Sequence, residues 1–379
     1  MMKIVPLCTS DISHMGENGM QCKYHKTSLL RLMYNTWRSF LLPFGRGVVG
    51  LLVLLLASCV NEEEFANTTD GNFEALWKIM DEHYCFFTLK ENELGVNWDE
   101  VHNRYSKQVT KSLASRQLFE IMTNMLGELR DGHVNISASF DYGRNWSWEE
   151  DYPTNLSDTL LRRYLGTDYH IASGMQYRIL DDNIGYLRCS TFESAFGEGN
   201  LDEILYYFMP CRALIIDIRS NGGGMLTSAE ALASRFIGNE DVLVGYMQHK
   251  TGKGHDDFSA MEEQWLRQPD KKRMRWHKPV AVLTNRGVYS AANEFTKYMR
   301  ACNATIIGDK TGGGAGMPFS SELPNGWAIR FSACPMYDVS RQSTEQGIEP
   351  DISVQLTDDD FYRGRDTIIE RARLFLSQQ

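Results

Sequence analysis

The sequence has little of what marks nucleic-acid-binding, metal-binding or membrane-spanning proteins. Its 379 residues include 39 Lys and Arg against 49 Asp and Glu, a net charge of −10. Such a charge repels nucleic acid, which we do not expect as a partner. The eight cysteines show no zinc-type spacing, and we predict neither a metal nor a cofactor. Because 10 prolines stand against 31 glycines, and no repeat or low-complexity segment occurs, we expect close turns rather than disordered linkers.

A long hydrophobic run is also lacking near the N-terminus. Arg46 precedes "GVVGLLVLLLASC", whose apolar core of about 11 residues is too short to span a bilayer comfortably. A basic flank, a short apolar core and small residues predict a secretory signal over residues 1–58. A start at Met33 would give a leader of usual length, so residues 1–32 are a candidate mis-assigned start.

The end of this signal, Leu56-Ala57-Ser58-Cys59, resembles the bacterial lipobox, in which the cysteine is lipidated and becomes the N-terminus. A plain signal peptide or a membrane anchor is the alternative. Residues 59–69, with "VNEEEF", form an acidic tether that resembles the export signals of lipoproteins in Bacteroides-like bacteria. We therefore expect a chain anchored by lipid at Cys59 in the outer membrane of the cell envelope, on its periplasmic side or the cell surface. Cleavage removes six basic and two acidic residues and leaves a net charge of about −14.

Helical periodicity dominates the first part of the mature chain. One face carries apolar residues from Phe73 on, with Asn72 as the expected N-cap, and a second stretch places Leu118, Met122 and Met125 together. We predict a helical subdomain over 70–132. The remaining predicted divisions are connecting strands and loops over 133–175, a core over 176–357 and a C-terminal helix over 358–379.

The core alternates between apolar runs and helical periodicity. "YRILDDNIGYLRCSTF" indicates a hairpin, and three buried strands are indicated by "RALIIDIR", "PVAVLTN" and "ATIIGDKTG". Helices between such strands favour an α/β layer with a mostly parallel sheet.

A triple glycine follows one of these strands in "LIIDIRSNGGG", residues 214–224. Glycines at a strand-to-helix turn let backbone N–H groups point into open space, as an oxyanion or phosphate site requires. The spacing fits neither a P-loop nor a dinucleotide fingerprint. We expect Gly222 or Gly223 to donate to an oxyanion, whereas a tight turn with positive φ is the plainer alternative.

A serine stands at a second junction of strand and helix, in "VLTNRGVYSAANEF", residues 282–295. At the positive end of a helix, Ser290 is placed to act as a nucleophile, and the N–H of Ala291 is the natural second oxyanion donor. Capping of the helix by the Ser290 hydroxyl is the alternative. A serine also needs a base, and His133 in "LGELRDGHVNI" is singled out because Gly132 permits a sharp turn there. Asp131 could orient its ring or cap the turn.

The ordered set "DGHVNI", "LIIDIRSNGGG", "VLTNRGVYSAANEF", "IIGDKTGGG" and "GIEPDI" resembles the C-terminal-processing and tricorn-like serine peptidases of family S41 over residues 70–357. This resemblance implies a ClpP/crotonase-like β-α core with an N-terminal helical subdomain. In the processing branch a lysine serves as base, but "TGGGAG" offers glycine or alanine there, and Lys310 lies outside that position.

The tricorn-like branch pairs its serine with a histidine and a glutamate. The resemblance therefore implies Ser290, His133 and Glu345, with Glu349 as the alternative acid.

One departure from many relatives concerns substrate binding. Only 43 residues separate His133 from Tyr177, too few for a PDZ module of about 80–100 residues. The sequence thus predicts a serine endopeptidase with an acyl-enzyme intermediate and a peptide or protein substrate. The alternatives are a non-catalytic ligand- or peptide-binding protein on the same scaffold, and thioester chemistry of the crotonase type.

Overall fold

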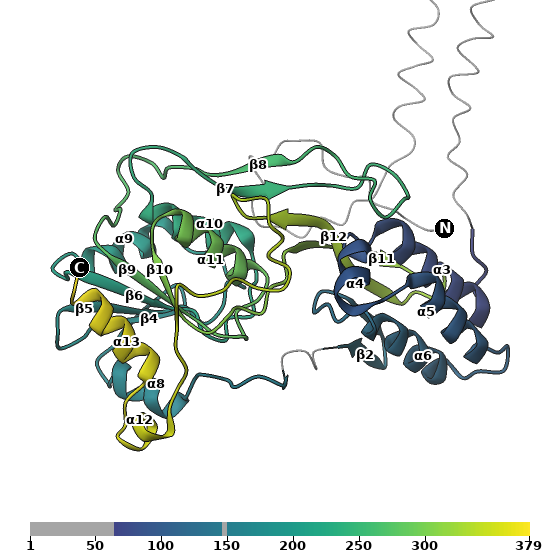
Figure 1. Ribbon diagram of the computed structural model, residues 1–379, viewed down its shortest axis with the longest axis horizontal. Coiled ribbons are helices and arrows are strands. Elements are labelled where there is room, and N and C mark those ends of the chain that lie inside the picture. Colours follow the sequence, from purple (N-terminus) through teal and green to yellow (C-terminus); the bar gives the residue numbers. More distant parts are fainter. Residues whose placement is uncertain (1–63, 146–149) are drawn as a thin grey trace, which may run out of the picture. The chain divides into compact units, whose positions relative to one another are not determined.

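Two β-sheets organise residues 64–145 and 150–379, which the computed structural model describes (Figure 1). The predicted signal over 1–58, the candidate start at Met33 and the lipidation site Cys59 lie outside these residues. Residues 65–379 form one compact unit. Within the described part, no helix combines the length and the apolar character needed to cross a bilayer.

The larger sheet has seven strands in the order β13-β10-β9-β6-β5-β4-β3, and neighbours from β5 to β13 are parallel. Strands β4 and β5 form the predicted antiparallel hairpin. The bounds are β3 (His170–Ala172), β4 (Met175–Ile179), β5 (Ile184–Arg188), β6 (Ala213–Asp217), β9 (Val280–Thr284), β10 (Thr305–Gly308) and β13 (Ile352–Ser353). The α/β class and the mostly parallel sheet are thereby confirmed.

Helices cover both faces of this sheet (Figure 1), which is why every residue of β5, β6 and β9 is buried. One face packs against α8 (Asp158–Leu165) and α13 (Thr367–Leu376). The other packs against α9 (Glu198–Tyr207), α10 (Leu226–Ala233) and α11 (Ala291–Ala301). Residues 358–379 contain two helices, α12 (Asp358–Tyr362) and α13, where the sequence predicts one.

The second sheet, with the path β2-β1-β12-β7-β8 and β11 paired to β12, has no counterpart in the sequence analysis. It joins segments far apart in the chain, because Asn135 pairs with Arg330. Its strands are β1 (Asn135–Ala138), β2 (Asp141–Arg144), β7 (Val242–Met247), β8 (Glu262–Leu266), β11 (Gly316–Glu322) and β12 (Ala328–Tyr337).

The N-terminal helices are α3 (Thr69–His83), α4 (Phe87–Leu94), α5 (Trp98–Tyr105) and α6 (Ser115–Gly127). The predicted apolar faces of α3 and α6 are buried. The expected N-cap Asn72 is wrong, because Thr68 caps α3 by accepting from the Gly71 amide. Asn72 is instead buried inside the helix, where its side chain donates to the Thr68 carbonyl and accepts from the Asn325 amide. The five described cysteines are free, and four of them are buried.

Candidate active site

Ser290 sits at a strained turn between β9 and α11. Its backbone angles are φ 55° and ψ −123°, a conformation that is rare outside glycine and typical of a nucleophile turn. The Ser290 hydroxyl makes no capping hydrogen bond to the helix. The capping alternative therefore does not explain this serine, whose side chain is half-buried.

His133 follows the turn after α6 and immediately precedes Val134 and β1. Its Nε2 atom lies 2.9 Å from the Oγ of Ser290, although 157 residues separate the two in the chain. Asp131 holds the backbone of this turn, because its Oδ1 accepts from the His133 amide at 2.8 Å. Asp131 therefore caps the turn. Its oxygens make no hydrogen bond to the His133 ring, which was the other role considered for it.

The glycine turn after β6 lies against the serine. A Cβ at Gly223, whose φ is 99°, would come within 2.9 Å of both the Ala291 nitrogen and the Ser290 Cβ. The Gly223 amide donates to the Asn221 side chain at 2.9 Å, so this predicted oxyanion donor is engaged here. Within the described residues, the amides of Gly222 and Ala291 donate to no protein acceptor. The backbone of Gly223 and the amide of Ala291 thus lie close to Ser290.

Loop 311–316 also contacts the serine turn, through main-chain hydrogen bonds. The Ser290 amide donates to the Gly313 carbonyl at 2.9 Å, and the Gly314 amide donates to the Glu345 carbonyl at 3.0 Å. A Cβ at Gly314 would lie 2.5 Å from the ring of Tyr289. The glycines in this loop therefore permit close packing between the serine turn and the segment that carries Glu345.

Glu345 is buried, but its carboxylate does not reach the base. One oxygen accepts from the Ala315 amide at 2.8 Å, and the other lies 3.6 Å from the Nζ of buried Lys90. The Nδ1 atom of His133 has no hydrogen-bond partner among the described residues. Glu349 pairs with Lys310 at 2.9 Å, and 72% of its side chain is exposed.

Asp131 is the centre of a buried network that the sequence analysis missed. Its Oδ2 accepts from the hydroxyls of Tyr84 at 3.1 Å and Ser332 at 2.8 Å, and Oδ1 accepts from Tyr289 at 3.3 Å. Tyr289 directly precedes Ser290, so one carboxylate connects the turn of the base with the turn of the serine. Tyr84 directly follows α3, and nothing in the sequence around Tyr84 or Ser332 signals this contact.

Burial sets the protonation of these groups. It lowers the pKa of His133 to about 4, against the opposing effect of the Asp131 charge. The imidazole is therefore unprotonated at neutral pH, as a general base requires. Burial would raise the pKa of Asp131, but Lys90 and His133 lower it below its usual value. At Glu345, burial and the Asp131 charge outweigh Lys90 and raise the pKa.

These opposite pKa shifts favour the neutral form of Glu345 and the charged form of Asp131. A cavity of about 500 Å³ borders Glu345, Lys90 and Tyr289. No group of three or more metal-type ligands occurs in residues 64–145 and 150–379. The contact between His133 and Ser290 suits deprotonation of an alcohol that lies next to main-chain donors.

Two sequence families match the chain. Residues 183–354 match the family described as Peptidase family S41, and residues 58–127 match the Tricorn protease C1 domain. The "Probable CtpA-like serine protease" of Staphylococcus epidermidis is 27% identical over 175 residues, covering 45% of this chain and 34% of that protein. "Carboxy-terminal processing protease CtpA" of Bacillus subtilis is 24% identical over 181 residues, covering 47% and 36%. The chain therefore spans about a third of the length of the curated relatives it matches.

Solved structures give broader matches. A candidate peptidase from Parabacteroides merdae is 50% identical, with a TM-score of 0.77, and the alignment covers 82% of this chain and 97% of that one. Mature CPAF has a TM-score of 0.63 at 12% identity, with 80% and 95% covered. The second likeness concerns the fold alone.

Proposed function

Because the chain belongs to peptidase family S41, we propose that it is a serine endopeptidase that hydrolyses peptide bonds in a peptide or protein substrate. The observation that carries this proposal is the 2.9 Å contact between His133 Nε2 and Ser290 Oγ. It brings a buried, unprotonated imidazole to an alcohol that does not cap its helix. No other role considered for Ser290 accounts for both features.

In the proposed mechanism Ser290 attacks the scissile carbonyl carbon while His133 takes the hydroxyl proton at Nε2. His133 then gives this proton to the leaving amine, and the peptide is left as an ester on Ser290. Water, deprotonated by His133, hydrolyses the ester and releases the second product.

The oxyanion of each tetrahedral intermediate binds the Ala291 amide and an amide of the Gly222–Gly223 turn. Each such donor contributes about 3–4 kcal/mol to transition-state stabilisation in measured cases. The amide of Gly222 is available as the structure stands. That of Gly223 would exchange its bond with Asn221 for the oxyanion.

Glu345 is proposed as the third residue of the catalytic set. Its carboxyl does not reach the His133 ring, so it would act on the imidazolium through an intervening group, and the nearby Asp131 charge adds to this stabilisation. Its burial beside Asp131 and Lys90 supports this choice over Glu349, which is exposed and paired with Lys310. The unpartnered Nδ1 of His133 needs an acceptor when the ring carries two protons, and an intervening group would supply it.

The non-catalytic alternative is less well supported. A binding protein on this scaffold has no need of a base within hydrogen-bond distance of a serine held in a strained conformation. We further propose that Cys59 is lipidated and that the enzyme acts at the cell envelope. The support is the tetrad Leu56-Ala57-Ser58-Cys59 after a short apolar run.

The test compares the mature chain with its Ser290→Ala form, on casein and on a library of fluorogenic peptides. The variant should lose hydrolysis and labelling by a fluorophosphonate probe, whereas Ser340→Ala, a change at an exposed serine, should keep both. Cleavage that persists in the Ser290→Ala protein would refute the assignment.

A further inference from the structure

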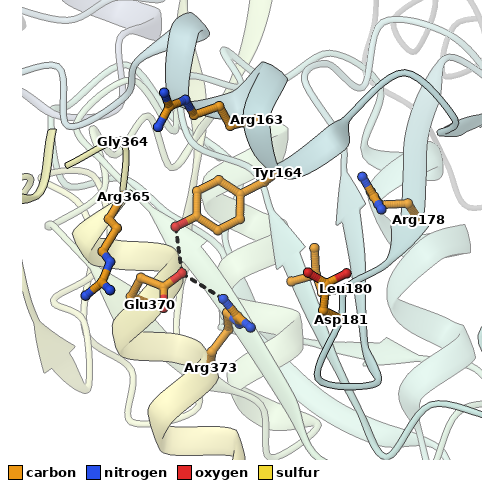
Figure 2. Close-up of a pocket in the computed structure, with 9 residues that line it drawn as sticks. All are labelled: Arg163, Tyr164, Arg178, Leu180, Asp181, Gly364, Arg365, Glu370 and Arg373. Atoms are coloured by element: carbon orange, nitrogen blue, oxygen red, sulfur yellow. Dashed lines mark hydrogen bonds and ion pairs between the residues drawn. The ribbon is translucent and has the colours of Figure 1, made fainter. Parts of the chain in front are cut away.

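A second polar cavity lies on the α8–α13 side of the larger sheet, among residues that the proposed reaction does not use. It has a volume of about 280 Å³. It is lined by residues of α8, of α13, of β4 with the turn that follows it, and of the loop between α12 and α13 (Figure 2). The residues that line it are Arg163, Tyr164, Arg178, Leu180, Asp181, Gly364, Arg365, Glu370 and Arg373.

The lining carries four arginines and only two carboxylates, in a chain whose net charge is −10. In Figure 2 the four guanidinium-bearing side chains stand around the ring of Tyr164. A local excess of positive charge in an acidic protein attracts anions to this place.

Internal pairing accounts for only part of this charge. Glu370 is occupied, because its Oε1 accepts from Tyr164 at 2.6 Å and from Arg373 at 2.8 Å (Figure 2). Arg373 also pairs with Asp182 at 2.9 Å. Arg178 lies 3.4 Å from Asp168, a carboxylate whose side chain is 75% exposed and which therefore neutralises it weakly.

Arg163 and Arg365 make no ion pair with any described residue. The guanidinium of Arg163 lies against the backbone at Gly364, where a Cβ would collide with it. The φ of Gly364 is 71°, a conformation that favours glycine, and Arg365 follows it in the chain. The guanidinium groups of Arg163 and Arg365 are thus available to a ligand at one edge of the cavity.

We propose that this cavity binds a small dianionic oxyanion group, such as a phosphate or a phosphate monoester. Guanidinium groups present paired N–H donors that match the oxygens of such a group, and two unpaired arginines balance two negative charges. The site is independent of Ser290 and does not rest on the proposed peptidase activity. The group belongs either to a free phosphate compound or to a lipid headgroup.

Titration calorimetry of the mature chain with inorganic phosphate, at constant ionic strength kept with chloride, tests the proposal. We expect saturable binding and a rise of Tm with phosphate, because a ligand of the native state stabilises it. The double variant Arg163→Ala/Arg365→Ala should weaken binding at least about tenfold. The variant Arg365→Lys keeps the charge but loses the paired N–H donors of the guanidinium. Its affinity for phosphate should lie between those of the wild type and the double variant.

Arg341→Ala, a change at an exposed arginine elsewhere in the chain, should leave phosphate binding unchanged. Vesicles with phosphatidic acid distinguish the source, since a lipid ligand predicts vesicle binding that the double variant loses. The absence of saturable phosphate binding would overturn the proposal. So would equal affinity in the wild type and the double variant, provided that the double variant unfolds cooperatively.

Discussion

The two halves of the candidate active site are built by different means. Around Ser290 the contacts are made by the backbone: glycines at 222–224 and 312–314, a strained φ at Ser290 and hydrogen bonds between main-chain groups. Around His133 they are made by buried polar side chains that converge on Asp131 from three distant segments. The serine side thus depends on the absence of side chains, and the histidine side on their charges.

This difference determines how each half tolerates substitution. A site formed by backbone contacts is disrupted when a side-chain atom is added, because closely packed main chain can move away only at a high cost in free energy. A buried charge network fails when a partner is removed, because the remaining group is left without compensation. The most damaging changes are therefore an added methyl on one side and a removed charge on the other.

The largest effect is expected on the serine side, from Gly223→Ala. The methyl would lie 2.7 Å from the Tyr289 carbonyl oxygen and 2.9 Å from the Ala291 nitrogen, at a φ of 99°. Displacing this turn removes one oxyanion donor, and kcat should fall about 10²–10³-fold. Gly199→Ala, in α9 with open space around it, is the control and should keep full activity. Comparable activity in the two variants would mean that the glycine turn has no catalytic role.

A smaller effect is expected on the histidine side, from Asp131→Asn. Asparagine keeps the shape but not the charge, and misplacement of the His133 turn should lower kcat up to about 10²-fold with KM little changed. Because the Asp131 charge raises the pKa of His133, the acidic limb of the kcat profile should also move to lower pH. A purely structural role would lower activity and leave this limb in place.

Asp359→Asn is the matched control, since this carboxylate is 88% exposed and forms only a surface pair with Arg363. Its kinetics should match the wild type. An Asp131→Asn enzyme that behaves like this control would remove Asp131 from the positioning network.

The same contrast explains which parts of the fold and of the candidate site could be predicted from the sequence. The serine half was predictable, because "NGGG" and "YSAA" are short local patterns whose glycine and alanine content states what the backbone must do. The parallel sheet was predictable from its fully apolar strands. His133 was singled out through Gly132 and its neighbours in the chain, and its ring lies beside Ser290.

The histidine half was not predictable in the same way. Lys90 in "TLKENEL" has the composition of a solvated helix, yet it is buried 3.6 Å from Glu345. Ser332 belongs to β12, whose pairing with β1 joins positions almost 200 residues apart, and no local pattern encodes that partner. The second sheet was missed for the same reason.

The smallest effect concerns the dependence of stability on pH. The native pKa of His133 is about 4 against a reference of 6.5, so below pH 6.5 the unfolded chain binds a proton that the native state refuses. Stability should therefore fall as the pH drops from 6.5 to 4. The native pKa of Glu345 is raised above its reference of 4.5, so above that pH the native state keeps a proton that the unfolded chain releases, and this contribution falls as pH rises. Each slope of the free energy of unfolding against pH is at most about 1.4 kcal/mol per pH unit.

Urea unfolding at a series of pH values measures both slopes. The variant His133→Gln should lack the acidic slope, and Glu345→Gln should lack the alkaline slope. An alkaline slope that persists in Glu345→Gln would show that the pKa of Glu345 is not raised in the native state.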